Sequence, residues 1–246
     1  MASACPVQET LPLPESERLS VFEPGTVADV LNPFRIRAGL SALVPEQERC
    51  PIEPDRVPRG WMCTYSFGIS LWEMRRMFGC NVNGQPSFVG SPWDWWLQPE
   101  EATWASKRPF AKGQFCLVSS QGHFGSLSWA MQGQAIERIL GSKFHRVPEA
   151  VYCEAFCATW LIQSVRRIGG PSIRPWSRYF RHWGNSLTSR GERVWIGLSR
   201  KGIEVGSCPT TNNSDPYLQV ALECPPDPLL AEHIAAPGVY NGNRTG

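Results

Sequence analysis

The stretch from Pro148 to Gly169 constrains the fold more than any other part of the chain. Four of its apolar side chains share one stripe at the 3.6-residue period of an α-helix: Val151, Ala155, Ile162 and Val165. Pro148 suits the first turn of a helix, while Arg166 and Arg167 suit the negative C-terminal end that Gly169 closes. The sequence therefore predicts one long helix over these residues.

Two shorter helices are predicted before it. The first covers residues 65–78, where four apolar side chains recur at helical spacing: Phe67, Leu71, Met74 and Phe78. Gly79 is its stop signal. The second runs from a Ser128 cap through Ile136 and Ile139 to a Gly141 stop. One more short helix fits residues 229–236, near the end of the chain.

Four strands are predicted from short runs rich in apolar and β-branched residues. Residues 114–119 fit a buried strand, and residues 217–222 fit another. Residues 194–198 and 203–206 form a predicted hairpin, in which Gly202 supplies the positive φ that the turn needs. Because the helices cluster before the hairpin rather than alternate with strands, we expect an α+β fold, with about three helices on one face of an antiparallel sheet.

The chain is expected to form a single domain with a loose segment at each end. Its 246 residues are enough to bury a core without help from disulfides or metal. Residues 1–24 are rich in Pro and Glu and predict a mobile arm, and Pro and Gly predict a flexible tail over residues 225–246. Residues 25–224 would then be the globular body.

Several classes of protein are disfavoured by what the sequence lacks. Its start carries no secretory signal and no run approaches 18 apolar residues, so we expect a soluble cytoplasmic protein without a membrane span. The nine Cys are an odd number without a C-x-x-C pair, which favours reduced thiols and no metal site. Motifs for nucleotides, calcium and hydrolases are missing, so no cofactor is expected.

The segment from 166 to 201 is strongly basic, with nine Lys and Arg against the single acid Glu192, whereas the whole chain carries only +2. Guanidinium groups grip phosphates and the interleaved aromatic rings can stack on bases, so this mixture favours a binding protein that engages nucleic acid or another polyanion. The candidate contacts are Arg174, Arg178, Arg181, Trp183, Arg190, Arg193, Arg200 and Lys201. In the alternative interpretation, the rings fill the core and the arginines form a solvated rim.

A second group of aromatic rings is Trp93, Trp95 and Trp96, in the sequence PWDWW. An extended segment would place Trp93 and Trp95 on one side and Trp96 on the other. At least one ring would then be available as a platform for a protein partner. The alternative is that these bulky side chains pin a loop into the core.

An enzyme is the remaining possibility, with no catalytic residue assigned. His123 lies in a Gly-flanked loop, where it would act with carboxylates. Cys153 and Cys157 lie one helical turn apart, but a nucleophilic thiol needs a base such as His145 or His182 from elsewhere. Two thiols on an apolar helix are more typical of a core, so binding is favoured over catalysis.

Several segments also follow one another in a familiar order: PWDWW with QPE at 92–100, RPFAKGQF at 108–115, VPEAVYCEA at 147–155, RHWGNS at 181–186 and GERVWIGLSRKGIEV at 191–205. With these aromatic, Gly and Pro positions, the chain resembles a family of uncharacterised (hypothetical) prokaryotic and phage proteins over about residues 60–222. That family has no assigned activity. The resemblance therefore implies a single domain and transfers no catalytic residue.

Overall fold

The structure is a computed structural model of the chain, and it describes residues 21–58, 60–79, 88–90, 94–119, 122–166, 181–199, 202–210, 218–219 and 222–235. Within these ranges, six α-helices and two β-sheets form an α+β fold, the class that the sequence predicts. The strands make two sheets where one antiparallel sheet is expected. Among the described helices, none combines the length and apolar character that crossing a bilayer requires.

The first sheet has five strands in the order β1–β2–β3–β9–β4. They are β1 (Val21–Phe22), β2 (Trp61–Ser66), β3 (Gln114–Ser119), β4 (His145–Arg146) and β9 (Leu222–Cys224). β2 and β3 pair antiparallel along their whole length, from Trp61 opposite Ser119 to Ser66 opposite Gln114. β1 is parallel to β2, and β9 is antiparallel to β3, so segments from both ends of the chain join this sheet.

The second sheet has the order β7–β6–β5–β8, with β5 (Arg181–Leu187), β6 (Arg193–Ser199), β7 (Gly202–Cys208) and β8 (Leu218–Gln219). β6 and β7 form the predicted antiparallel hairpin, in which Gly202 has φ 125°. Because side chains alternate along a strand, this sheet has two different faces. One face buries Val194 and Ile196 in the main core, and the other carries Trp183 and Trp195.

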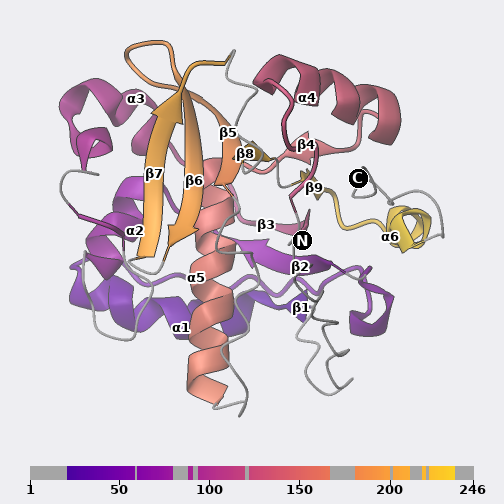
Figure 1. The fold of residues 1–246 in the computed structure, drawn as a ribbon. Helices are drawn as coiled ribbons and strands as arrows, with labels where there is room; N and C mark the ends of the chain where they lie inside the picture. The colour runs from indigo at the N-terminus through magenta and orange to yellow at the C-terminus, as the bar shows by residue number, and fades with distance from the viewer. Residues whose placement is uncertain are drawn as a thin grey trace, which may run out of the picture.

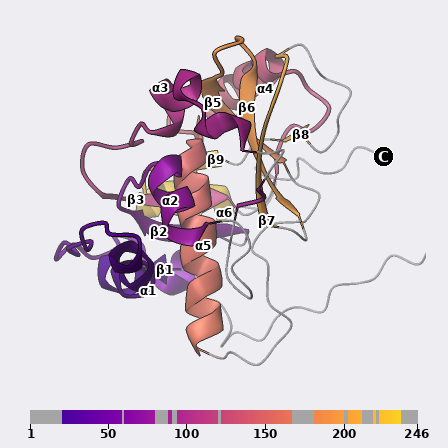
Figure 2. The same ribbon diagram turned by 90° about the vertical axis from the view of Figure 1, so that its left-hand side faces the viewer.

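α5 (Glu149–Arg166) is the central element, and it matches the long helix that the sequence predicts (Figure 1). It packs against α1 (Pro24–Arg37), α2 (Leu71–Phe78), β2, β5 and β6, and so connects both sheets to the helices. Figure 2 shows α1 beside one half of α5 and the β5–β6–β7 strands beside the other half. Cys153 and Cys157 are buried on α5, as small core residues would be.

Shorter helices connect these elements. α3 (Ala102–Ala105) follows two 3₁₀ turns at Trp95–Leu97 and Pro99–Glu101, and another 3₁₀ turn lies at Pro54–Arg56. α4 (Trp129–Ala135) begins after Ser128, whose hydroxyl accepts a hydrogen bond from the Met131 N–H, and a π-helical turn at Ile136–Leu140 continues it. Gly141 ends this segment with φ 86°, so both the predicted Ser128 cap and the predicted Gly141 stop are present.

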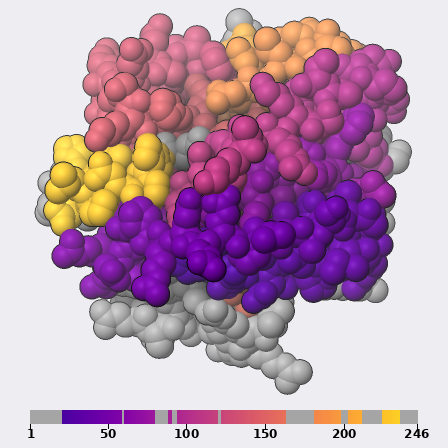
Figure 3. Space-filling view, turned by 180° about the vertical axis from the view of Figure 1, so that it is seen from behind, coloured from indigo at the N-terminus to yellow at the C-terminus, as the bar shows by residue number. Residues whose placement is uncertain are grey.

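The packed body is longer than the predicted 25–224. At its start Phe22 is buried and β1 pairs with β2. At its end α6 (Pro228–Ala235), a short helix close to the one that the sequence allows, buries Leu230, Ala231 and Ile234 in a core cluster. Figure 3 shows α6 in yellow, seated beside the indigo and purple N-terminal segments. Residues 225–235 are therefore not a flexible tail.

Two further predictions need correction, and one helix was not predicted. The helix expected at 65–78 is only α2, because residues 65 and 66 pair with β3 and Ser70 and Glu73 form a capping box that starts the helix at Leu71. The strand expected at 217–222 is two short strands, β8 and β9, in different sheets. α1 is not among the predicted helices, although Pro24 occupies its first turn.

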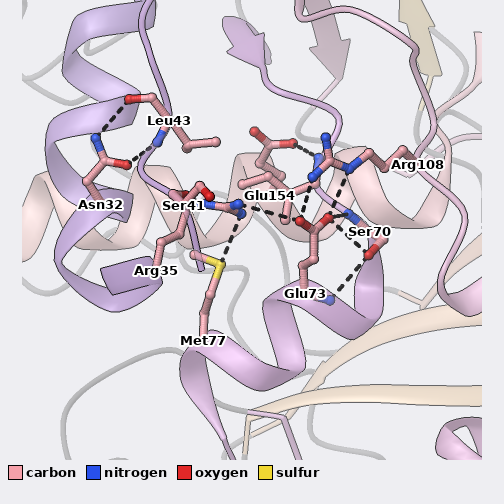
Figure 4. A network of polar contacts seen from close by, with 10 residues as sticks. Asn32, Arg35, Ser41, Leu43, Ser70, Glu73, Met77, Arg108 and Glu154 are labelled. Carbon is pink, nitrogen blue, oxygen red and sulfur yellow. Dashed lines mark hydrogen bonds and ion pairs between the residues drawn. The ribbon is translucent and has the colours of Figure 1, made fainter. Parts of the chain in front are cut away.

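Glu73 ties α2 to two other segments (Figure 4). Its carboxylate accepts hydrogen bonds from Arg108 Nη2 at 2.7 Å and Nε at 3.2 Å, and from the buried Arg35 at 3.5 Å. Arg35 also donates to the Ser41 carbonyl at 2.8 Å. Burial acts to raise the pKa of Glu73, but the bonds from Arg108 and Ser70 outweigh burial and hold this pKa below its ordinary value. We interpret this network as a structural tie between α1, α2 and the segment before β3.

Candidate functional site

A cavity of about 480 Å³ lies where the 3₁₀ turns before α3 meet the turn between β5 and β6 and the end of β7. One wall consists of Trp95, Gln98, Glu100 and Glu101. The other wall consists of Thr188, Ser189, Arg190, Glu192 and Ser207. The cavity thus brings together one member of each predicted cluster, Trp95 from the tryptophan group and Arg190 from the basic segment. We call it the Trp95 pocket.

Glu101 joins the two walls of the Trp95 pocket. Its buried carboxylate accepts hydrogen bonds from the Ser189 hydroxyl at 2.6 Å, the Ser189 N–H at 3.1 Å and the Trp104 indole N–H at 2.6 Å. Burial acts to raise the pKa of Glu101, but these donors outweigh it and hold the pKa below its ordinary value. Glu101 is therefore an ionised acceptor, fixed in place by the opposite wall.

The turn between β5 and β6 is rigid for local reasons. The Thr188 hydroxyl accepts from the N–H groups of Arg190 at 3.2 Å and Glu192 at 3.1 Å, and Gly191 supplies a positive φ of 78°. The Glu192 carboxylate accepts from the Ser207 hydroxyl at 2.6 Å, which ties the turn to β7. Polar groups of this wall are consequently positioned before any ligand arrives.

Trp95 offers the pocket an apolar surface. Its indole N–H donates to the Val205 carbonyl at 3.0 Å, and its half-buried ring lies 6.0 Å from the Trp104 ring. With the polar end of the indole already used, the ring face is what remains for contact with a ligand. Trp96 is only 1% exposed and packs on Phe88, so it is a core residue.

The tryptophan group is not an extended segment. Residues 95–97 form a 3₁₀ turn, and Trp93 lies outside the described residues. Asp94, just before the turn, pairs with Arg75 of α2 at 3.0 Å. The turn and this ion pair set Trp95 against the pocket while they direct Trp96 inward.

The basic segment is only partly described, because Arg174, Arg178, Arg200 and Lys201 lie outside the described residues. Arg181 stacks on the Trp195 ring, with the guanidinium carbon 4.8 Å from the ring centre, and Arg193 stacks on Trp129 at 3.9 Å. Trp183 has no exposed surface and so has no face on which a base could stack. In this part of the segment, two arginines pack on tryptophan rings, and the Trp183 ring belongs to a buried cluster.

Trp129 carries a second guanidinium, that of Arg146, at 4.6 Å. Arg146 is buried and donates to the Gln132 side-chain oxygen at 2.8 Å and to the Trp129 carbonyl at 2.5 Å. Burial, with a smaller contribution from the charge of Arg193, lowers the pKa of Arg146 to about 10. Two cations around one indole hold α4 against β4 and β6.

The residues considered for catalysis lie away from the Trp95 pocket. His182 is buried on β5, where its Nε2 lies 2.5 Å from the Val147 carbonyl, and burial lowers its pKa to about 3. Burial likewise lowers the pKa of His123 to about 4. Neither His lines the pocket. In the described part of the chain, no group of three or more His, Cys, Asp or Glu could hold a metal ion.

Comparisons of the chain with family models, with curated proteins and with solved structures find no match. The pocket must therefore be interpreted from its own chemistry. Sequence reasoning named Trp95 and Arg190 but missed the residues that hold the two walls together, chiefly Glu101 and Ser189. The one available signal was Gly191, which marks a turn after the TSR run of residues 188–190.

Proposed function

We propose that the protein binds a small polyhydroxylated molecule, a carbohydrate, in the Trp95 pocket. The observation that carries the proposal is an aromatic face in a cavity whose two polar walls are held in place by Glu101. A cavity of about 480 Å³ is within the range of small-molecule sites, roughly 300–1,000 Å³. A few fixed polar groups around an aromatic surface are the usual composition of such sites.

Charge and hydrogen-bonding capacity select the class of ligand. The pocket has three carboxylates, at Glu100, Glu101 and Glu192, against the one cation Arg190, so it repels anions. It also offers acceptors from its carboxylates and donors from the exposed side chains of Gln98 and Arg190. A sugar hydroxyl donates and accepts at once, and the C–H face of a pyranose ring is flat and apolar. Such a ligand matches both the walls and the Trp95 ring.

Binding rather than hydrolysis is the activity that we infer. A glycosidase needs one carboxylic acid with a raised pKa to protonate the leaving oxygen. The pKa of Glu101 is instead lowered, and its oxygens already accept from Ser189 and Trp104. An ionised carboxylate that already accepts from Ser189 and Trp104 has no proton to transfer, so Glu101 holds the two walls together and does not act as a catalytic acid.

Arg190 gives the sharpest test, because its side chain is exposed in the turn and its removal should leave the fold intact. The full chain would be screened on an immobilised glycan array, and hits would be measured in solution by calorimetry. Loss of one hydrogen bond to a charged donor should weaken binding about 10- to 100-fold in Arg190→Ala. The matched control is Arg138→Ala, since Arg138 is also exposed but does not line the pocket.

Two results would contradict the proposal. One is an array on which no neutral glycan binds above background. The other is a glycan that binds Arg190→Ala and Gln98→Ala as tightly as it binds the wild type, because binding would then take place elsewhere on the protein.

Nucleic-acid binding remains a second candidate function for the basic segment. The observation in its favour is that Arg181 and Arg193 lie on the same face of the second sheet and both stay partly exposed. If Arg181 contacts phosphate, Arg181→Ala should flatten the log–log salt dependence of binding by about 0.7–0.9. Binding weaker than about 100 μM to both DNA and RNA at physiological salt would exclude this function.

A further inference from the structure

We propose that Cys50 and Cys63 are a reversible dithiol–disulfide pair that responds to peroxides. Their sulfur atoms lie 2.9 Å apart, although the two residues are 13 positions apart in the chain. Cys63 is in β2, between β1 and β3, and Cys50 is in the segment that follows α1. Both thiols are free in the described structure. This pair lies outside the Trp95 pocket, so the inference is independent of the proposed function.

The two thiols differ in access, and this difference assigns their roles. Cys50 is partly exposed, whereas Cys63 has no exposed surface. A peroxide can therefore reach Cys50 first, and Cys63, whose sulfur lies 2.9 Å away, is placed to attack the product. The neighbouring Ile52 is buried in the same core cluster as Cys63, which keeps the Cys50 segment against β2.

Acidity supports the same roles. The hydrogen bond between the thiols lowers the pKa of Cys50, and that bond together with burial raises the pKa of Cys63. Because the thiolate is the form that reacts with peroxide, Cys50 is the better nucleophile of the two. By contrast, burial raises the pKa of Cys153 and Cys157, so those two adjacent thiols should stay inert.

Oxidation of the pair needs no reactant other than the two thiols and hydrogen peroxide. The Cys50 thiolate attacks one oxygen of hydrogen peroxide, the O–O bond breaks, and Cys50 becomes a sulfenic acid while hydroxide leaves. The Cys63 sulfur then attacks the Cys50 sulfur, the S–O bond breaks, and water leaves with the thiol proton. Two thiols lose two electrons in total and the peroxide gains them. A small dithiol reductant reverses the reaction by exchange.

The test exposes the reduced full-length protein to a small excess of hydrogen peroxide, blocks the remaining thiols, and maps disulfide-linked peptides by mass spectrometry. We expect one dominant link, between Cys50 and Cys63, which dithiothreitol removes. In Cys63→Ala the reaction should stop at Cys50, where a sulfenic-acid probe would label it. Cys116→Ala is the matched control, because it removes a buried thiol on the adjacent strand and should leave the link intact.

Three outcomes would overturn the proposal. The first is a dominant disulfide between other cysteines, and the second is that the sulfenic-acid probe labels Cys50 no faster than Cys116. The third is that Cys50 is oxidised but forms no disulfide with Cys63. If Cys63→Ala does not fold, the wild-type peptide map and the order in which its thiols are modified still decide the matter.

Discussion

Gly206 of β7 lies directly opposite Trp195 of β6, and adding one methyl group there tests whether the tryptophans of the basic segment are packing residues. A Cβ atom on Gly206 would lie 2.1 Å from Cζ2 and 2.3 Å from Cε2 of the Trp195 ring. Non-bonded carbon atoms pack at about 3.5–4.0 Å. The Gly206→Ala substitution must therefore displace the ring by more than about 1 Å.

The ring has little space to move. Trp195 is only 7% exposed, and the Arg181 guanidinium lies over the ring at 4.8 Å. Overpacking of a core costs about 1–3 kcal/mol, and loss of the Arg181 contact adds about 0.5–2 kcal/mol. We expect Gly206→Ala to lower the free energy of unfolding by about 1.5–5 kcal/mol, which lowers Tm by about 3–20 °C in a chain of this length.

Urea denaturation followed by tryptophan fluorescence measures this change. The control is Gly25→Ala in the first turn of α1, where no atom lies within 4 Å of the added Cβ. Because alanine reduces the freedom of the unfolded chain, this control should be neutral or stabilise the protein by up to about 1 kcal/mol. If the free energy of unfolding of Gly206→Ala is within about 0.5 kcal/mol of the wild-type value, the Trp195 ring does not pack against Gly206. The core-and-rim interpretation of the basic segment, in which its rings fill the core, would then fail.

Two further predictions concern buried carboxylates. Gly184→Ala would place Cβ 1.9 Å from Glu149 Oε1, so we expect a loss of stability at least as large as that of Gly206→Ala; a wild-type Tm would contradict this contact. Burial raises the pKa of Glu154 to about 7, above its ordinary value near 4.5, although Ser66, Phe67 and Ile69 donate to it. The unfolded chain releases this proton at lower pH than the folded protein does, so the free energy of unfolding should fall between pH 5 and pH 8, by about 2–3 kcal/mol from this group. In urea titrations at pH 5 and pH 8, the decrease in the free energy of unfolding should be smaller in Glu154→Gln than in the wild type. An equal decrease in the two proteins would show that Glu154 does not titrate in this range.

Local signals in the sequence located the elements whose ends are marked by their own residues. β3 has the predicted bounds, α5 begins after Pro148, and the segment that starts with α4 runs from the Ser128 cap to Gly141. Where a local pattern and a long-range pairing disagreed, the pairing decided the structure. Residues 65 and 66 fit a helical stripe, yet the antiparallel ladder with β3 holds them in a strand.

The candidate site could not be derived in the same way. Glu101 and Ser189 are 88 positions apart, and no local pattern indicates that they hydrogen-bond. A charge count along the basic segment gave nine cations but not their neighbours. Arg190 faces a pocket with three glutamates, whereas Arg181 and Arg193 lie on tryptophan rings. The sequence supplied the residue types, and the fold decided which of them meet.

The most direct test of the Trp95 pocket follows the side-chain indole and guanidinium N–H signals of the labelled protein by NMR during titration with neutral mono- and disaccharides. Trp95→Phe and Arg190→Ala would assign the two signals. We predict saturable shifts of the Trp95 and Arg190 signals at one common dissociation constant, and an unmoved signal for the buried Trp183. If no saccharide shifts Trp95 saturably, or if Trp183 moves as much as Trp95 does, the pocket is not a carbohydrate site.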